Sequence, residues 1–298
     1  MNSSLNTTAE EDLEQLRNKR PRPCPAPFAT LFESGWIDME ICRIPLLLVC
    51  AMVLLVGLGV HGQERGGGRG GRGAQPPQTP KAGAPIDLTG YWVANVTTDW
   101  RWRMTVPAKG DYRGLPLNLE ARKLADTWDP ARDEASGEQC RSYGAPAIMR
   151  VPGRIHITWQ DDQTLKLETD RGRQVRVFYF GTPLGKGGDW QGVSQASWDR
   201  VPGAGGIAGS ALVPSGALKV VTTKFRPGYL RKNGVPYSAN GILTEFYDVI
   251  KEPTGDEYLV VSITFEDPTY LNNKYETAVN FKKQTDSAGW DPSPCTSR

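Results

Sequence analysis

Few side chains in this sequence are suited to acid–base or nucleophilic chemistry. The 298 residues include two histidines, His61 and His156. His61 falls in a predicted targeting segment, which leaves His156 for the folded region. The most unusual acid is Glu245, because it alternates with Leu243 and Tyr247 on the apolar face of a predicted strand. A carboxylate in that setting must either pair with a cation or keep a raised pKa.

Two interpretations of Glu245 follow. In the first, a buried arginine such as Arg150 or Arg176 neutralises the carboxylate, which then has no catalytic role. In the second, Glu245 is a general base with Tyr237 or His156 as its partner, and the chain is a secreted hydrolase or isomerase. The sequence leaves both open, because the strand pattern does not say what lies opposite Glu245.

Two further motifs resemble catalytic loops but lack their essential parts. Residues 181–187, GTPLGKG, lack the Ser or Thr that follows lysine in a phosphate-binding loop, and no helix is predicted after them. Residues 192–196, GVSQA, resemble a nucleophile elbow, but their surroundings are strands alone. With one histidine and two cysteines after the targeting segment, we expect no metal site and no cofactor.

Aromatic side chains support a different function, the binding of a small molecule. The chain has 9 tryptophans and 10 tyrosines, which can line an apolar or sugar-stacking pocket or fill a small core. We therefore expect a non-enzymatic barrel that binds a small apolar or aromatic ligand inside or at its mouth, with the enzyme as the alternative. The expected ligand-binding residues are Trp92, Trp102, Arg150, Trp159, Trp190, Tyr237, Ser238 and Glu245.

Three alternating segments, 154–160, 164–170 and 173–180, predict the strands at the centre of the fold. Apolar and polar residues alternate in each with a period of two, as in antiparallel strands with one buried face. Turn-forming residues at 161–163 and 170–172 join them into a meander. Ile155 and Ile157 share one face of the first strand and His156 lies on the other. Which face points inward decides whether His156 can serve a site.

The rest of the folded region continues the strand pattern. We expect further strands at 92–104, 190–200, 217–225, 241–250, 257–266 and 275–282, and one helix at 119–127 with Asn118 as its N-cap. Gly90 and Trp92 form a Gly-x-Trp motif at the first strand, as in lipocalin-like folds. The sequence therefore predicts an all-β fold: an antiparallel lipocalin- or calycin-like barrel of about ten strands with one short helix.

The N-terminal part of the chain has the pattern of an export sequence. Residues 44–60 are apolar throughout but short for a membrane span, and Gly62 fits a cleavage site. We expect 39–62 to be a signal peptide cleaved after Gly62, and 1–38 to be an extension upstream of the true start at Met39. The alternative is an uncleaved anchor at 44–60.

Processing at Gly62 would leave a simple domain organisation. Residues 63–85 would form a flexible linker rich in Gly, Arg and Pro, and residues 86–298 a single barrel domain. The mature protein would be periplasmic or secreted, without a membrane span. The net charge of +2 gives no argument for a nucleic-acid partner, so a small-molecule ligand is the expected partner. We make no prediction of the oligomeric state.

Two cysteines, Cys140 and Cys295, follow the predicted cleavage site. Disulfides persist in the oxidising compartments to which exported proteins travel. We therefore expect a Cys140–Cys295 bond, with two free thiols as the alternative.

Short motifs occur in a fixed order along the folded region. They are Cys140, 143–149 (YGAPAIM), 190–194 (WQGVS), Trp198, 218–222 (LKVVT), 236–238 (PYS), 244–245 (TE) and 266–268 (EDP). Together they resemble a large family of uncharacterised exported bacterial proteins, and the resemblance covers 87–295. It implies export and a lipocalin-like barrel. Other members have histidine before Ser238 where this chain has Tyr237, and many have a Trp-Glu-Gly-Asp turn where this chain has Asp-Arg after Trp198.

Overall fold

The computed structural model describes residues 78–200 and 216–298. The predicted upstream extension, the signal peptide and most of the predicted linker lie outside the described residues. The last residues of that linker are described, and they contact the barrel: Trp198 Nε1 donates to the Pro80 carbonyl at 2.8 Å, and the Lys81 amide donates to the Asp162 carbonyl at 3.2 Å. No helix in the described ranges has the length and apolar character to span a membrane.

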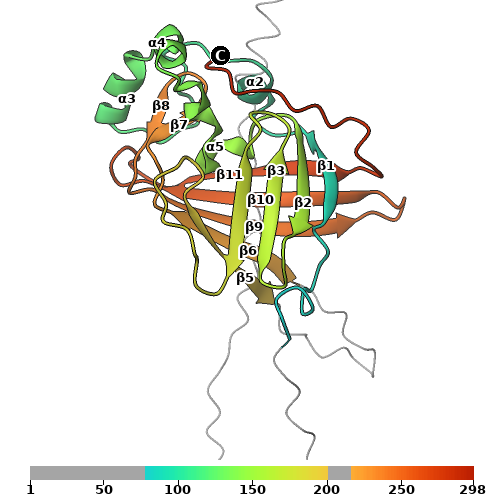
Figure 1. Cartoon of the computed structure of the whole chain (residues 1–298). Coiled ribbons are helices and arrows are strands. Elements are labelled where there is room, and N and C mark those ends of the chain that lie inside the picture. The colour runs from blue at the N-terminus through green and yellow to red at the C-terminus, as the bar shows by residue number, and fades with distance from the viewer. Residues whose placement is uncertain (1–77, 201–215) are drawn as a thin grey trace, which may run out of the picture. The chain divides into compact units, whose positions relative to one another are not determined.

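A closed β-barrel forms the body of the fold (Figure 1), and the prediction of an all-β barrel is confirmed. Its strands follow one another around the barrel in the order β1-β11-β10-β9-β6-β5-β4-β3-β2. Their bounds are β1 Gly90–Asn95, β2 Arg154–Trp159, β3 Thr164–Thr169, β4 Val175–Phe180, β5 Val193–Arg200, β6 Gly216–Thr223, β9 Ile242–Lys251, β10 Glu257–Glu266 and β11 Tyr275–Lys283.

One pair of barrel strands is parallel, which departs from the predicted antiparallel arrangement. Phe178 of β4 lies opposite Ser194 of β5, and both strands run in the same direction. In a closed ring of antiparallel neighbours the direction alternates, so the number of strands must be even. This barrel has nine, so at least one pair must be parallel. Residues 181–192 connect the two strands, and Ser194, the second residue of β5, lies opposite Phe178, the fourth residue of β4.

A group of short helices and a two-stranded ribbon gathers at one end of the barrel (Figure 1), and we call this group the cap. The prediction had a single helix. The cap consists of α2 Trp100–Met104, α3 Leu119–Asp126, α4 Pro130–Ala135, the 3₁₀ helix η1 Gln139–Tyr143, α5 Ala145–Ile148, and the ribbon of β7 Gly228–Arg231 with β8 Val235–Tyr237.

In the cap, one sequence prediction is confirmed and another is wrong. The predicted N-cap is confirmed, because the Asn118 side chain accepts a hydrogen bond from the Ala121 amide at 2.9 Å. The predicted strand over 92–104 is wrong in its second half, where residues 100–104 form α2. Asp99 precedes α2 with a φ of +53°, a left-handed conformation that breaks the extended chain.

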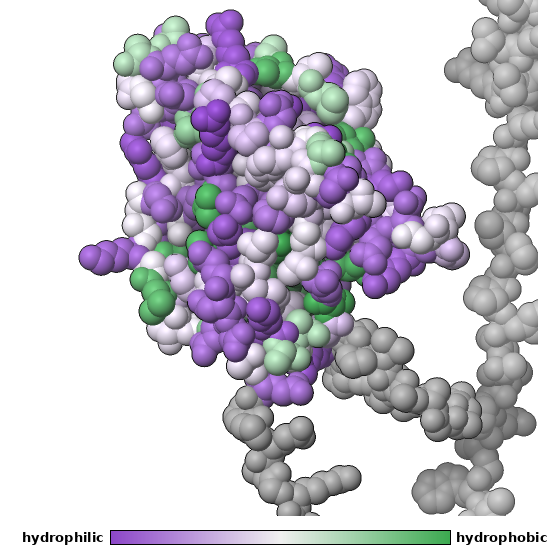
Figure 2. Space-filling model, turned by 45° about the vertical axis from the view of Figure 1, so that its right-hand side comes forward, coloured by the Kyte–Doolittle hydropathy of each residue, from purple (hydrophilic) through white to green (hydrophobic). Residues whose placement is uncertain are grey.

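The C-terminal segment returns from β11 to the cap. The Gly172 amide donates to the Ser293 carbonyl, and the Ser293 amide donates to the Asp170 carbonyl, both at 2.9 Å. Cys295 is joined to Cys140 of η1, which confirms the predicted disulfide. The face of the molecule shown in Figure 2 is mostly hydrophilic, and its hydrophobic residues form small separate groups.

Candidate functional site

The barrel interior encloses a buried ion pair between Arg176 and Glu245. Both side chains are 0 % exposed. Arg176 donates from Nη1 and Nη2 to the two Glu245 carboxylate oxygens, at 2.9 and 2.5 Å. Tyr247 donates to Glu245 Oε1 at 3.2 Å, and Arg176 Nη2 also donates to Thr222 Oγ1 at 3.3 Å. The polar cluster thus satisfies both carboxylate oxygens inside an apolar barrel.

This geometry shows the pairing with a buried arginine that the first interpretation of Glu245 requires. Burial lowers the pKa of Arg176. The electrostatic interactions with Glu245 and then with Tyr247 raise it by a larger amount, so the net shift of the pKa is upward. Desolvation and the Glu245 charge also raise the pKa of Tyr247, which keeps its hydroxyl protonated. A carboxylate held by two guanidinium N–H groups and a phenol is poorly placed to accept a substrate proton.

The two proposed partners of Glu245 lie elsewhere. Tyr237 is the last residue of β8 in the cap, and its buried ring packs edge-to-face on Phe225 and Phe265 with centroids 5.9 and 6.1 Å away. Its hydroxyl has no hydrogen-bond partner among the described residues. Ser238 is held by Asp267, whose carboxylate accepts from the Ser238 amide and hydroxyl at 2.7 Å each. This motif therefore forms part of the connection between cap and barrel.

The unpartnered hydroxyl of Tyr237 leads to a stability prediction. We expect Tyr237→Phe to leave the free energy of unfolding unchanged or to raise it by up to about 1 kcal/mol, because it removes a desolvated hydroxyl that makes no hydrogen bond. Urea denaturation measures the change. The matched control is Tyr247→Phe, which removes a hydroxyl bonded to Glu245 and should cost about 1–3 kcal/mol. Equal losses in both variants would contradict the prediction.

His156 points to the outside of the barrel. Ile155 and Ile157 are buried on the inner face of β2, while the His156 ring stacks on Tyr91 of the neighbouring strand at a centroid distance of 3.9 Å. Glu168 Oε2 lies 3.5 Å from His156 Nδ1. His156 is therefore a member of a surface cross-strand cluster and does not face Glu245.

The remaining aromatic candidates are dispersed. Trp92 is fully buried in the core, with its Nε1 donating to the Leu88 carbonyl at 3.0 Å. Trp159 packs on Phe180, with ring centroids 5.6 Å apart, at the barrel end away from the cap. The Trp190 ring lies under the guanidinium group of Arg226. These rings fill separate parts of the core and surface and do not line one cavity.

Two of the predicted ligand-binding residues, Trp102 and Arg150, do share a pocket. It has a volume of about 530 Å³ and lies in the cap between α2, α5, β7 and the C-terminal segment. We call it the cap pocket. Its apolar lining residues include Trp102, Met104, Val106, Ala147, Val151, Pro152, Leu230 and Pro294.

The cap pocket is strongly cationic. Its lining contains no aspartate or glutamate among the described residues, and its five cationic side chains are Arg103, Arg150, Arg171, Arg231 and Lys232. These cations come from α2, the second residue after α5, the 170–172 turn, and the last residue of β7 with the residue that follows it. Tertiary structure alone brings them together.

Three of these arginines are buried and interact with one another. Arg103, Arg150 and Arg231 are 8 %, 6 % and 4 % exposed. Burial, and then repulsion from Arg150, lower the pKa of Arg103 from 12.5 to about 10. The same two causes lower the pKa of Arg231. Asp99 is the carboxylate that acts on both, and it is paired with Arg150 at 2.9 Å. Three guanidinium groups against one carboxylate leave excess positive charge.

The hydrogen bonding of these arginines is also incomplete. Arg103 Nε donates to the Arg150 carbonyl at 2.9 Å, and Arg231 Nη1 donates to the Arg113 carbonyl at 2.8 Å. Arg103 Nη1 and Nη2, Arg150 Nε and Arg231 Nε are buried without a partner in the described part of the chain. Such groups are costly unless something satisfies them.

Lys232 and Tyr143 also line the cap pocket. Lys232 Nζ donates to the Tyr143 hydroxyl at 2.6 Å and to Thr296 Oγ1 at 3.1 Å. Desolvation raises the pKa of Tyr143, but the hydrogen bonds from Lys232 and Thr296 together lower it more, so the net shift is downward. These contacts hold the C-terminal segment against the pocket.

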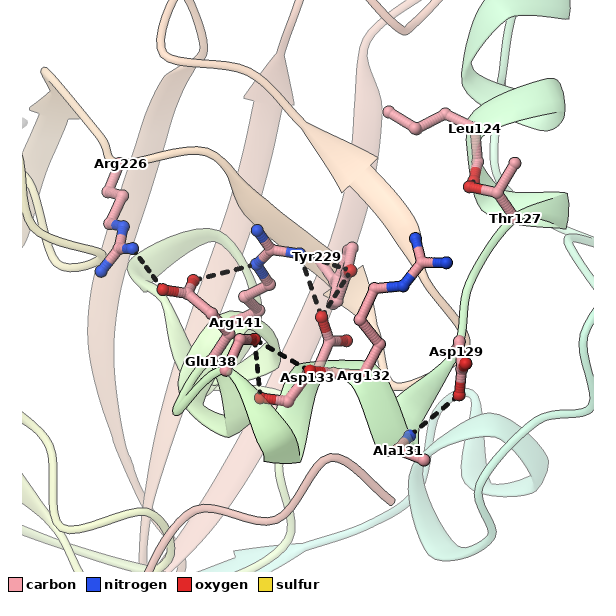
Figure 3. A network of polar contacts seen from close by, with 11 residues as sticks. Leu124, Thr127, Asp129, Ala131, Arg132, Asp133, Glu138, Arg141, Arg226 and Tyr229 are labelled. Atoms are coloured by element: carbon pink, nitrogen blue, oxygen red, sulfur yellow. Dashed lines mark hydrogen bonds and ion pairs between the residues drawn. The ribbon is translucent and has the colours of Figure 1, made fainter.

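A second polar network explains how β7 is positioned (Figure 3). Arg141 Nη1 donates to Asp133 Oδ1 and to the Tyr229 hydroxyl, both at 3.0 Å, and Glu138 accepts from Arg141 and Arg226. Here acids and cations are matched. Tyr229 lies in β7 two residues before Arg231, so the network fixes the strand that carries Arg231 to the cap pocket. We assign it a structural role.

Sequence reasoning identified Trp102 and Arg150 but missed Arg103, Arg171, Arg231, Lys232 and Tyr143. Arg103 falls within the predicted strand over 92–104, and nothing in the local sequence relates it to residues more than a hundred positions later. Comparison with family models, curated proteins and solved structures finds no match for this chain.

Proposed function

We propose that this protein binds a small organic anion in the cap pocket. The observation that carries the proposal is the combination of five cationic side chains with no lining carboxylate in a cavity of about 530 Å³. Buried charge is normally paired or bound to a counterion. An anionic group in the pocket would compensate the excess charge of Arg103, Arg150 and Arg231.

The size and the lining of the cap pocket indicate an organic molecule. Small-molecule sites commonly have volumes of about 300–1,000 Å³, and they combine an apolar lining with a few polar groups that orient the ligand. Trp102, Leu230 and Pro294 supply apolar surface beside the cations. This changes the ligand expected from the sequence, an apolar or aromatic molecule, to one that also carries negative charge.

The same observations favour binding over acid–base catalysis. The described lining of the cap pocket has no histidine or carboxylate to act as a general base, and Glu245 is paired with Arg176 inside the barrel. Export remains part of the proposal. It is supported by the export pattern of residues 39–62, by the family resemblance, and by a disulfide of the kind that oxidising compartments favour.

A pair of fluorescent probes tests the proposal. 8-Anilinonaphthalene-1-sulfonate is an organic anion, and N-phenyl-1-naphthylamine is the same ring system without the sulfonate. We expect the anion to bind at least about tenfold more tightly, and Arg103→Met or Arg231→Met to weaken it about tenfold or more, as for loss of a charged hydrogen bond. The affinity of the neutral probe should change little.

Two controls separate binding from folding. Arg122→Met removes an exposed arginine of α3 with the same change in net charge, and it should leave both affinities unchanged. Arg103→Met also relieves repulsion within the cluster, so its unfolding temperature without ligand should equal or exceed that of the wild type. Equal binding of the two probes, or equal effects of Arg103→Met and Arg122→Met, would refute anion binding in the cap pocket.

A further inference from the structure

The mouth of the cap pocket is bordered by exposed apolar side chains. Trp100, Met104 and Val106 are 65 %, 60 % and 46 % exposed. Trp100 and Met104 lie four residues apart in α2, a spacing that places them side by side on one helix face. Met104 and Val106 also line the cap pocket. We call these three residues the apolar rim.

The apolar rim continues beyond the cap pocket. Val106 and Pro107 line both the cap pocket and a neighbouring open groove, which also contains Trp128 and Pro130. The groove is also lined by the charged residues Lys109, Asp129, Arg132 and Arg298, so a chain that leaves the cap pocket over Val106 gains apolar contact from the Val106, Pro107 and Trp128 side chains. Single exposed apolar residues are ordinary, but a run of them at the mouth of a ligand pocket marks an interaction site.

We infer that the anion is the head of a single-chain amphiphile whose apolar tail lies along the apolar rim. This inference rests on the proposed function, because the cations of the cap pocket must first hold the head. The two parts of the surface are complementary to the two parts of such a molecule: positive charge inside, and exposed apolar side chains at the exit. The class of ligand is an alkyl or aryl-alkyl carboxylate, sulfate or phosphate.

A homologous series of ligands tests the inference. Alkyl sulfates with chains of four to ten carbons, below their micellar concentrations, are titrated calorimetrically against the full chain. We expect the dissociation constant to fall about two- to fourfold for each added methylene, as for partial to full burial of a CH₂ group. The gain should stop once the chain extends past the apolar rim.

Variants at the rim separate the tail from the head. Trp100→Ser with Met104→Ser should reduce the gain per methylene, and Trp100→Ser alone, at a residue outside the pocket lining, should leave the affinity for the shortest sulfate unchanged. Ile250→Ser is the matched control, because Ile250 is 48 % exposed on β9 at the barrel end away from the cap. It should leave the whole series unchanged.

The outcomes distinguish this inference from the proposed function. If short sulfates bind but chain length has no effect, or if the rim variants leave the gain per methylene unchanged, the amphiphile inference is overturned and the anion site stands. If no member of the series binds, both fail. If the protein sediments with phosphatidylglycerol vesicles but binds no monomeric alkyl sulfate, the amphiphile inference is overturned in favour of binding to a membrane surface.

Discussion

Arg176→Met is expected to lower the free energy of unfolding by about 3–5 kcal/mol, because it leaves the Glu245 carboxylate buried without its counter-charge. Arg176 donates two hydrogen bonds to Glu245, and both side chains are 0 % exposed. Water therefore does not replace the lost donors in the variant. Denaturant unfolding followed by circular dichroism gives the change.

The double variant Arg176→Met, Glu245→Leu provides the critical comparison. It removes both charges and replaces them with apolar groups, so it should recover most of the loss seen in Arg176→Met alone. The exposed pair of Lys274 and Glu266, with side chains 55 % and 44 % exposed, is the matched control. Lys274→Met should cost less than about 1 kcal/mol. If Arg176→Met left the free energy of unfolding unchanged, the prediction would be wrong, because burial of Glu245 would then not require this ion pair.

The same variants test the role of Glu245. Since the ion pair lies inside the barrel and the cap pocket lies between cap elements, the folded double variant should bind the anionic probe as the wild type does. Loss of binding in a stable double variant would instead place Glu245 in the functional site, as the enzyme hypothesis requires.

Removal of the Cys140–Cys295 disulfide is the second large effect that we expect. The two cysteines are 155 residues apart in the sequence, so the bond closes a long loop in the unfolded chain. Replacing both with serine should lower the free energy of unfolding by about 2–5 kcal/mol. Unfolding curves of the wild type with and without a reductant should show a difference of similar size.

The disulfide also supports the cap pocket. Ser293, Pro294 and Thr296 line the pocket on either side of Cys295. Hydrogen bonds from Gly172 and Lys232 still hold this segment after reduction, so we expect weaker binding of the anionic probe in a barrel that stays folded. Unchanged affinity and stability after complete reduction, checked by thiol titration, would count against both roles of the bond.

Local pattern was sufficient for much of the barrel. The alternation of residues 154–180 predicted β2, β3 and β4 to within about two residues at each end. One face of each strand is buried, so apolar and polar residues alternate along its sequence. Asn118 predicted the start of α3 for a similarly local reason, since its side chain bonds an amide three residues later. The disulfide followed from the number of cysteines and the expected compartment.

Short or non-local features were beyond this kind of argument. Residues 100–104 alternate Trp and Arg as a strand would, and five residues are too few to distinguish a period of two from a helical turn. The barrel needs at least one parallel pair of strands, here β4 and β5, because an odd number of strands closes it. The sequence of a single strand does not show how many strands close the barrel.

The candidate site was decided by tertiary structure almost entirely. Sequence alternation placed Glu245 on a buried face, but its partner Arg176 lies 69 residues away and is chosen by the closure of the barrel. Arg103, Arg150 and Arg231 come from three separate segments, and the sequence around each of them does not indicate the other two. A repeating pattern reports which face of an element is buried. The charges that share one cavity depend on how distant elements pack, and here that packing brings dispersed arginines together around the cap pocket.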